Sequence, residues 1–233
     1  MPQIRVEHVS KRYKEEKRYQ YALQDFSLTI NQGEFVFLIG SSGAGKSTLL
    51  QIMGNQISPD KGSVFLDERN ISMMVGPLRA LTARNFGIVH QQSTLIRKRT
   101  IEENLSVAAQ AAGMRRQSIT PAIKKVLGLV GLSGVEKKFP VELSIGECRR
   151  IELARALINS PPILLIDELT ANLDDDVIWD LMHLLTEIND RGTTIVMATH
   201  ASQYVNILRR RVVTLVDGRL AGDVKKGKYG SLV

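Results

Sequence analysis

The segment from Gly40 to Thr48 constrains the fold of this chain more than any other. It reads Gly-Ser-Ser-Gly-Ala-Gly-Lys-Ser-Thr and matches the phosphate-binding pattern G-x-x-x-x-G-K-[ST]. Residues 34–39 before it are almost entirely apolar, as in a strand buried on both faces, and an apolar helical pattern follows it. A strand, a glycine-rich loop and a helix in this order predict a loop that cradles phosphates.

Each residue type in this loop suits nucleotide binding. The glycines let backbone N–H groups curl around a β-phosphate, and the next helix adds the positive end of its dipole. We expect Lys46 to reach the β- and γ-phosphates and the Ser47 hydroxyl to ligate Mg²⁺. The predicted ATP-binding residues of the loop are Gly40, Ser41, Ser42, Gly43, Ala44, Gly45, Lys46, Ser47 and Thr48.

Two further strands end in residues that suit phosphate chemistry. The apolar run 163–166 leads into Asp167 and Glu168, and α/β folds bind ligands at the carboxyl ends of their strands. Asp167 suits Mg²⁺, and Glu168 suits the polarisation of a water towards the γ-phosphate. His200 directly follows an expected strand and can donate a hydrogen bond to a phosphate oxygen. Acidic pairs end many strands and a lone histidine is often a surface residue, so both assignments depend on the neighbouring loop.

The segment Leu143-Ser-Ile-Gly-Glu147 has two compatible interpretations. Ser144 and Glu147 fit a capping box at the start of a helix. A helix N-terminus with the small residues Ser144 and Gly146 also makes an anion site. The local pattern does not separate the two.

Strands alternate with helices along the chain, which predicts a parallel sheet. Strands are expected at residues 4–9, 26–30, 34–39, 64–66, 86–90, 163–166, 193–198 and 212–216. Helices are expected from residue 46 onward and at residues 101–112, 121–130, 147–157 and 176–190. Because strands lie on both sides of the helical block, it is interpreted as a subdomain at about residues 92–158 within one domain of residues 1–233.

Composition limits the function without deciding it. The chain has 233 residues, the size of one large α/β domain. Its net charge of +7 suggests nucleotide, nucleic acid or a lipid surface as a neighbour, although a basic soluble surface explains it equally well. The single cysteine, Cys148, excludes an intrachain disulfide and fits a reducing compartment.

No segment suggests a signal peptide or a membrane span. The N-terminal residues lack the apolar region of a signal peptide, and no apolar run approaches the roughly 20 residues that cross a bilayer. Membrane association is therefore expected only through a partner.

The order of the motifs resembles the ATP-binding-cassette (ABC) ATPase family across essentially the whole chain. The resemblance is carried by Gly40–Thr48, Gln91, Leu143–Glu147, Asp167-Glu168, Asn172–Asp174 and His200. It implies an α/β P-loop NTPase fold with an antiparallel β subdomain and an inserted α-helical subdomain. It also implies ATP hydrolysis with Mg²⁺ in a homodimer whose two sites are shared between the subunits.

The resemblance assigns a role to each of these residues. By resemblance, Gln91 contacts Mg²⁺ and the attacking water. The implied catalytic residues are Glu168 as base, His200, Gln91 and Lys46, and the implied Mg²⁺ ligands are Ser47, Gln91 and Asp167. Ser144 and Gly146 would contact the γ-phosphate held by the other subunit, and Asp174 would belong to the D-loop beside the nucleotide.

An aromatic residue is implied to stack on adenine. Tyr13 resembles it, but Tyr19 and Tyr21 compete for the role because the loop here looks longer than usual.

Four positions depart from the family pattern, namely Ile145, Cys148, Leu169 and His90. Ile145 stands where the family has a glycine. A β-branched residue resists positive φ, so we expect it to alter the geometry of the closed dimer and to slow turnover.

Within the family, the chain is most similar to the FtsE group of cell-division ATPases, through residues 33–40, 42–50, 188–200 and 227–230. This likeness implies an FtsX-like integral membrane protein as partner, control of cell-wall hydrolases, and a peripheral position at the cytoplasmic face of the bacterial inner membrane. LolD- or MacB-like transporter ATPases share much of the pattern. A nucleic-acid- or ribosome-associated ABC protein is favoured only by the charge, and no specific nucleic acid is expected.

Two apolar residues follow Gln91 in a polar, basic stretch. Leu95 and Ile96 either pack under their own loop or line a groove that receives a short helix of the membrane partner.

Overall fold

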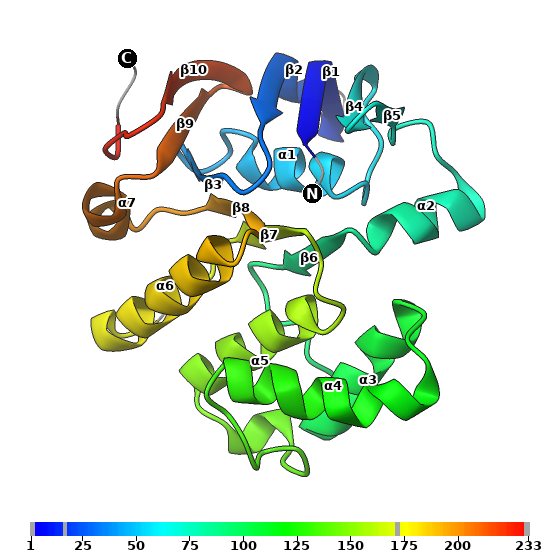
Figure 1. The fold of residues 1–233 in the computed structure, drawn as a ribbon. Coiled ribbons are helices and arrows are strands. Elements are labelled where there is room, and N and C mark those ends of the chain that lie inside the picture. Colours follow the sequence, from blue (N-terminus) through cyan, green and yellow to red (C-terminus); the bar gives the residue numbers. More distant parts are fainter. Residues whose placement is uncertain (1–2, 16–17, 171–172, 231–233) are drawn as a thin grey trace.

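A computed structural model describes residues 3–15, 18–170 and 173–230. Its central sheet has six strands in the order β10-β9-β3-β8-β7-β6 (Figure 1). All its strands are parallel except β10, which pairs antiparallel with β9 at one edge. The bounds are β3 Phe35–Ile39, β6 Phe86–Val89, β7 Ile163–Asp167, β8 Thr194–Ala198, β9 Arg211–Val216 and β10 Arg219–Val224.

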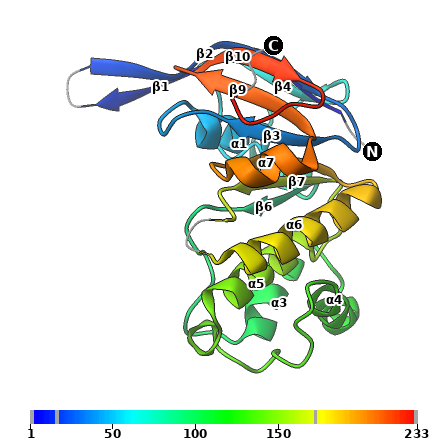
Figure 2. The same cartoon turned by 90° about the vertical axis from the view of Figure 1, so that its left-hand side faces the viewer.

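A second, antiparallel sheet has the order β2-β1-β4-β5. Its strands are β1 Ile4–Glu15, β2 Arg18–Ile30, β4 Lys61–Leu66 and β5 Arg69–Asn70. Helix α1, Lys46–Met53, lies between the two sheets, and the far end of the β1–β2 pair projects beyond them (Figures 1 and 2). The buried side chains of α1 join those of both sheets in one apolar cluster.

A helical block stands between β6 and β7 in the sequence. It consists of α3 Ile101–Ala111, α4 Arg116–Leu129, the 3₁₀ turn η1 Pro140–Glu142 and α5 Ile145–Leu157. The block packs on the side of the central sheet away from the antiparallel sheet (Figure 1). The predicted α/β fold, with an antiparallel β subdomain and an inserted helical subdomain, is confirmed.

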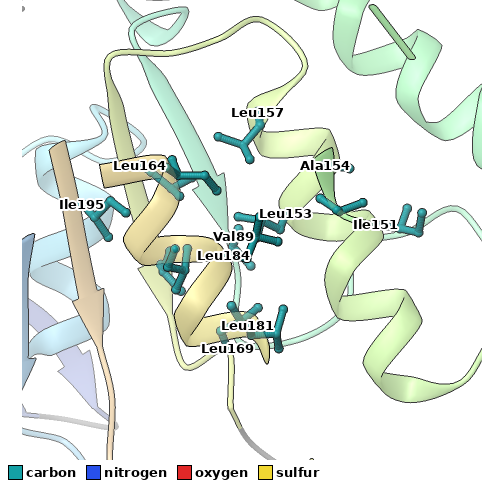
Figure 3. Close-up of a cluster of buried hydrophobic side chains, with 14 of the residues drawn as sticks. Val89, Ile151, Leu153, Ala154, Leu157, Leu164, Leu169, Leu181, Leu184 and Ile195 are labelled. Carbon is teal, nitrogen blue, oxygen red and sulfur yellow. The ribbon is translucent and has the colours of Figure 1, made fainter. Parts of the chain in front are cut away.

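Helices α5 and α6 (Asp175–Asp190) meet over the central sheet in an apolar cluster. Figure 3 shows Leu153 and Leu157 of α5 facing Leu164 of β7 and Leu181 of α6. The buried residues of α6 recur every three or four positions, which gives the helix one apolar face. Each fully buried leucine contributes about 1.5–3 kcal/mol to folding, so this cluster holds α5 firmly against the sheet.

The structure contains elements that local patterns did not predict, namely β5, α2 Gly76–Ala83, η1, α7 Ser202–Leu208 and β10. Helix α4 begins five residues before Pro121, where the prediction began it. Pro121 is tolerated inside the helix because Ile119 and Ile123 on either side of it are buried, so packing outweighs the lost backbone hydrogen bond. Among the described residues, no helix is both long enough and apolar enough to cross a membrane.

Candidate functional site

The glycine-rich loop joins β3 to α1 and passes close to the backbone of other strands. A Cβ atom at Gly45 would lie 2.2 Å from the carbonyl oxygen of Ala22, and one at Gly40 would lie 2.4 Å from that of Leu215. Both glycines also have positive φ, 103° at Gly45 and 152° at Gly40. Only glycine fits such positions, so the glycines in the motif are required by this fold.

Lys46 begins α1 and is 7% exposed. Its Nζ donates hydrogen bonds to the carbonyl oxygens of Gly40 and Ser41, both at 2.9 Å. Burial lowers the pKa of Lys46, and the nearby carboxylates of Glu168 and Asp167 partly offset that shift. The ammonium is thus held at the mouth of the loop, where an anion would stabilise its charge.

A cavity of about 270 Å³ opens in front of the loop. It brings together side chains from β1, β2, the loop, α1 and the ends of β6, β7 and β8. They are Tyr13, Ala22, Ser42, Gly43, Gly45, Lys46, Ser47, Thr48, Gln91, Asp167, Glu168 and His200. All the residues predicted as catalytic or Mg²⁺-binding line this one cavity.

Glu168 follows β7 with an unusual backbone. Its φ is 54°, a left-handed conformation that costs a non-glycine residue about 1–2 kcal/mol. The N–H of Glu168 donates to the carbonyl oxygen of Ala198 at 3.1 Å, which holds this conformation against β8. Nε2 of His200 lies 3.6 Å from Oε2 of Glu168. Strain of this kind is concentrated at functional sites, which fits a carboxylate held in place for chemistry.

Among the three candidate tyrosines, Tyr13 is the one that lines the cavity. All three are exposed. The guanidinium of Arg12 lies 4.6 Å from the ring centroid of Tyr19. The geometry therefore favours Tyr13 as the platform for a planar ring.

Ser144 caps α5 as predicted. Its Oγ accepts a hydrogen bond from the N–H of Glu147 at 3.2 Å, and its own N–H donates to Oε2 of Glu147 at 2.8 Å. The capping box is confirmed. The backbone N–H of Ser144, and after it the Ser144 side chain, lower the pKa of the Glu147 carboxylate from its ordinary value.

Ser144, Gly146 and Asp174 do not line the cavity. A Cβ atom at Gly146 would lie 2.8 Å from Cγ1 of Val177 in α6, so the start of α5 approaches α6 closely. Asp174 is the N-cap residue of α6, and its side chain makes no capping hydrogen bond there. The predicted D-loop residue Asn172 lies outside the described residues.

The positive φ assumed for Ile145 is not found in this structure, while its effect on the closed dimer and on turnover stays a prediction. Ile145 is the first residue of α5 and does not belong to the residues with positive φ. Its side chain is 61% exposed. A helical backbone is open to isoleucine, so this substitution forces no distortion on the helix start.

Sequence reasoning missed one interaction at the site. Arg149 of α5 donates from Nη2 to the carbonyl oxygen of Gln91 at 2.8 Å. Glu152, three residues later, pairs with Arg149. The i, i+3 spacing of opposite charges was visible in the sequence, but the loop that they bind was not.

Comparison with known proteins gives a consistent result. A family model described as ABC transporter matches residues 23–171. The cell division ATP-binding protein FtsE of Streptococcus pneumoniae is 43% identical over 209 residues, which cover 90% of this chain and 91% of that protein. The chain belongs to the ABC transporter family, in its FtsE group. FtsE of Mycobacterium tuberculosis is 40% identical, over 97% of this chain and 98% of that protein.

The fold agrees with that membership. The ABC cassette MJ0796, solved as a dimer in a post-hydrolysis state with ADP and Pi, has a TM-score of 0.88 and 31% identity. The match covers 97% of this chain and 100% of that one. As a member of the family, the chain is an ATP-binding subunit and an ABC-type ATPase.

Proposed function

We propose that the chain hydrolyses ATP as one subunit of a homodimer and couples hydrolysis to an FtsX-like membrane protein in cell division. The observation that carries the proposal is the meeting of Lys46, Glu168 and His200 in one cavity. The S. pneumoniae and M. tuberculosis relatives are named for cell division. The chain would lie peripherally at the cytoplasmic face of the bacterial inner membrane.

The residues of the cavity divide the chemical work. Lys46 neutralises charge on the β- and γ-phosphates. Glu168 takes a proton from the attacking water, and its left-handed backbone fixes the carboxylate at the end of β7. His200 lies beside that carboxylate and donates to the γ-phosphate. Tyr13 at the rim stacks on adenine.

The donors in the cavity fit Mg²⁺. Ser47, Gln91 and Asp167 offer a hydroxyl, an amide oxygen and a carboxylate. In the part of the chain that the structure describes, no group of three His, Cys, Asp or Glu forms a protein-only metal site. Mg²⁺ is commonly held by one or two carboxylates together with waters and phosphates. When bound, the ion would neutralise charge on the β- and γ-phosphates.

The second copy supplies the rest of the site. Ser144 and Gly146 lie outside the cavity of their own chain. They stand at the N-terminus of a helix of 13 residues, which favours an anion. We propose that they contact the γ-phosphate of ATP held by the other subunit, with Asp174 near the junction. The dimeric state of MJ0796 supports this arrangement.

The helical block has a part of its own in this proposal. We propose that residues 92–158 form a subdomain of a single domain, residues 1–233, and that this subdomain carries Ser144 towards the second copy. The block is inserted between β6 and β7 and has helices of its own.

The predicted partner groove at Leu95 and Ile96 stays a prediction. Leu95 is 8% exposed and belongs to the main apolar core, whereas Ile96 is 42% exposed. Leu95 also lines a cavity of about 300 Å³ beside η1 and the start of α5. A second cavity, of about 290 Å³, lies between α2, β6, α3 and the end of α5. Its lining is rich in small residues, including Ala80, Ala83, Gly87, Ala108, Ala111 and Ala112.

We propose that a short helix of the membrane partner docks at this α2–α3 groove. Small residues let a helix approach closely, and apolar anchors hold it. Leu78 and Leu81 of α2 are exposed close to Ala80 and Ala83 of the lining and can serve as such anchors.

The experiment is a membrane co-purification with the tagged chain held in its ATP state by Glu168→Gln. Capture of an FtsX-like protein supports the proposal, while capture of the membrane subunit of a LolD- or MacB-like transporter supports the transporter alternative. Leu78→Asp with Leu81→Asp should abolish capture and leave ATP affinity within about threefold, under 1 kcal/mol. Ile96→Asp is the matched exposed control. Loss of capture in the control alone would place docking at residues 95–96.

A further inference from the structure

The loop that follows β6 is fastened to α5 at both of its ends. Arg149 donates from Nη2 to the carbonyl oxygen of Gln91 at 2.8 Å and from Nη1 to that of His90 at 3.4 Å. Oε1 of Glu152 accepts a hydrogen bond from the N–H of Thr94 at 3.3 Å. One face of α5 therefore fixes residues 90–94 through their backbone.

Arg149 and Glu152, the side chains that make these contacts, form a buried ion pair. Nη1 of Arg149 lies 2.8 Å from Oε2 of Glu152, and the side chains are 10% and 2% exposed. Charge-assisted hydrogen bonds are strong and short in such surroundings. A buried ion pair often adds no net stability over an apolar pair of similar volume, because desolvation offsets the attraction. The distinctive contribution of this ion pair is geometric. Its Arg149 guanidinium holds the carbonyl groups of residues 90 and 91, and its Glu152 carboxylate holds the N–H of Thr94.

A third side chain extends the attachment. Arg155 donates from Nη1 to the carbonyl oxygen of Thr94 at 2.7 Å, and from Nη2 to its hydroxyl. Burial lowers the pKa of Arg155 and the charge of Glu152 opposes that shift. Successive turns of α5 thus hold this loop.

The position of this attachment within α5 matters. Arg149 lies five residues after Ser144, roughly 7.5 Å along the helix axis at about 1.5 Å per residue. Gln91, the residue whose carbonyl it holds, lines the cavity with Lys46 and Glu168. A single rigid helix therefore connects the Ser144 end of α5 to the loop that positions the Gln91 side chain.

We propose that Arg149 and Glu152 are positioning residues for Gln91, and that they make Gln91 move together with the Ser144 end of α5. The inference rests on the proposed function, in which Gln91 acts on the chain's own ATP and Ser144 on the ATP of the second copy. Contact of Ser144 with the second ATP is then transmitted through α5 to the chain's own Gln91.

The test replaces the pair by apolar residues of similar volume, Arg149→Met with Glu152→Leu, in the full-length chain. Such a swap often leaves stability unchanged, so the loop loses its attachment while the helix persists. We expect kcat to fall about 10-fold or more, because small misplacements of a catalytic group cost this much. KM for ATP should stay within about threefold. Arg149→Lys, which keeps one charge, should give an intermediate kcat.

A double-mutant cycle with Gln91→Ala tests the route. If the pair acts through Gln91, the swap should cause no further loss of kcat in the Gln91→Ala background. The matched control is Lys137→Met with Glu102→Leu, an ion pair of the same helical block that lies 2.5 Å apart and belongs neither to residues 90–94 nor to the cavity lining. This control should keep the kcat of the unmodified chain.

Three outcomes would overturn the inference. The first is an unchanged kcat in the folded swap variant. The second is a further fall in kcat when the swap is added to Gln91→Ala, by the same factor as in the unmodified chain. The third is an equal fall of kcat in the Lys137→Met, Glu102→Leu control. If the swap variant does not fold, Glu152→Gln serves in its place, because it keeps the shape and removes the charge. Glu168→Gln reports separately on the proposed function: if it turns over normally, the base assignment fails whatever the pair does.

Discussion

The two halves of the proposed catalytic site are built in different ways. Lys46 and Glu168 stand beside the ends of β3 and β7, strands whose apolar side chains are fully buried. Ser144 stands at an exposed helix end, where the capping box satisfies two backbone N–H groups, those of Ser144 and Glu147. The Lys46–Glu168 half is fixed by the core of the chain itself, whereas the Ser144 half is an exposed surface that another molecule can reach. This difference fits the proposed function, in which one chain holds a nucleotide and needs a second copy to complete the reaction.

The largest expected effect is at the buried half. Glu168→Gln should reduce kcat about 100-fold or more, as is typical for loss of a general base, and should leave ATP binding intact. Lys46→Ala should lose ATP binding itself, because it removes the ammonium that the loop holds. Steady-state ATPase assays and equilibrium nucleotide binding separate the two. Equal turnover in Glu168→Gln and in the unmodified chain would contradict the assignment.

The next effect concerns the exposed half. Gly146→Ala places a Cβ atom 2.8 Å from Val177, and relief of such overpacking costs about 1–3 kcal/mol. The start of α5 should shift away from α6, and ATPase activity should fall about 10-fold through weaker dimerisation, while a monomer keeps its ATP affinity. Light scattering with Mg-ATP in the Glu168→Gln background measures the dimer.

Val177→Ala provides the compensating change for that variant. It opens space beside position 146 and should restore much of the activity and of the dimer. If Gly146→Ala weakens ATP binding to the monomer instead, the two halves of the site are not independent.

A smaller effect is expected from the cap alone. Ser144→Ala should lower the free energy of unfolding by about 1 kcal/mol, as for other lost N-caps. ATP affinity of the monomer should not change, because Ser144 lies outside the cavity. Urea unfolding and nucleotide titration check the two parts. An unchanged stability would show that the cap contributes nothing to this helix.

The smallest effect is a pH dependence of the same cap. Hydrogen bonds from the backbone and side chain of Ser144 lower the pKa of Glu147 below its ordinary value of 4.5. A lowered carboxyl pKa stabilises the folded state above the ordinary value, and this stabilisation is lost as the pH falls through the lowered pKa. The stability difference between the unmodified chain and Glu147→Gln should therefore shrink in acid. A constant difference across that range would remove the cap as its cause.

Local chemistry was predictable where a few neighbouring residues decide it. The glycines of the loop, the capping box at Ser144 and the acidic end of β7 are set by turns, helix ends and strand ends, which are short-range features. For the same reason the order of strands and helices was predicted well. Boundaries were less certain: α4 begins before Pro121 because buried neighbours hold it there.

Contacts between segments far apart in the sequence decided which side chains line the cavity and which are buried. Three tyrosines close in the sequence looked alike until the pairing of β1 with β2 left Tyr13 at the cavity and Tyr19 beside Arg12. Leu95 and Ile96 are adjacent and apolar, yet the core covers one and leaves the other exposed.

The sequence by itself determined the glycine-rich loop between a buried strand and a helix, and with it the proposed phosphate site, because that motif needs only local backbone geometry. Only the tertiary structure decided which side chains share the cavity, and that Arg149 and Glu152 hold the Gln91 loop. Those contacts join segments nearly 60 residues apart. Burial and hydrogen bonding across such separations depend on how the sheet and helices pack, and a sequence pattern does not contain that information.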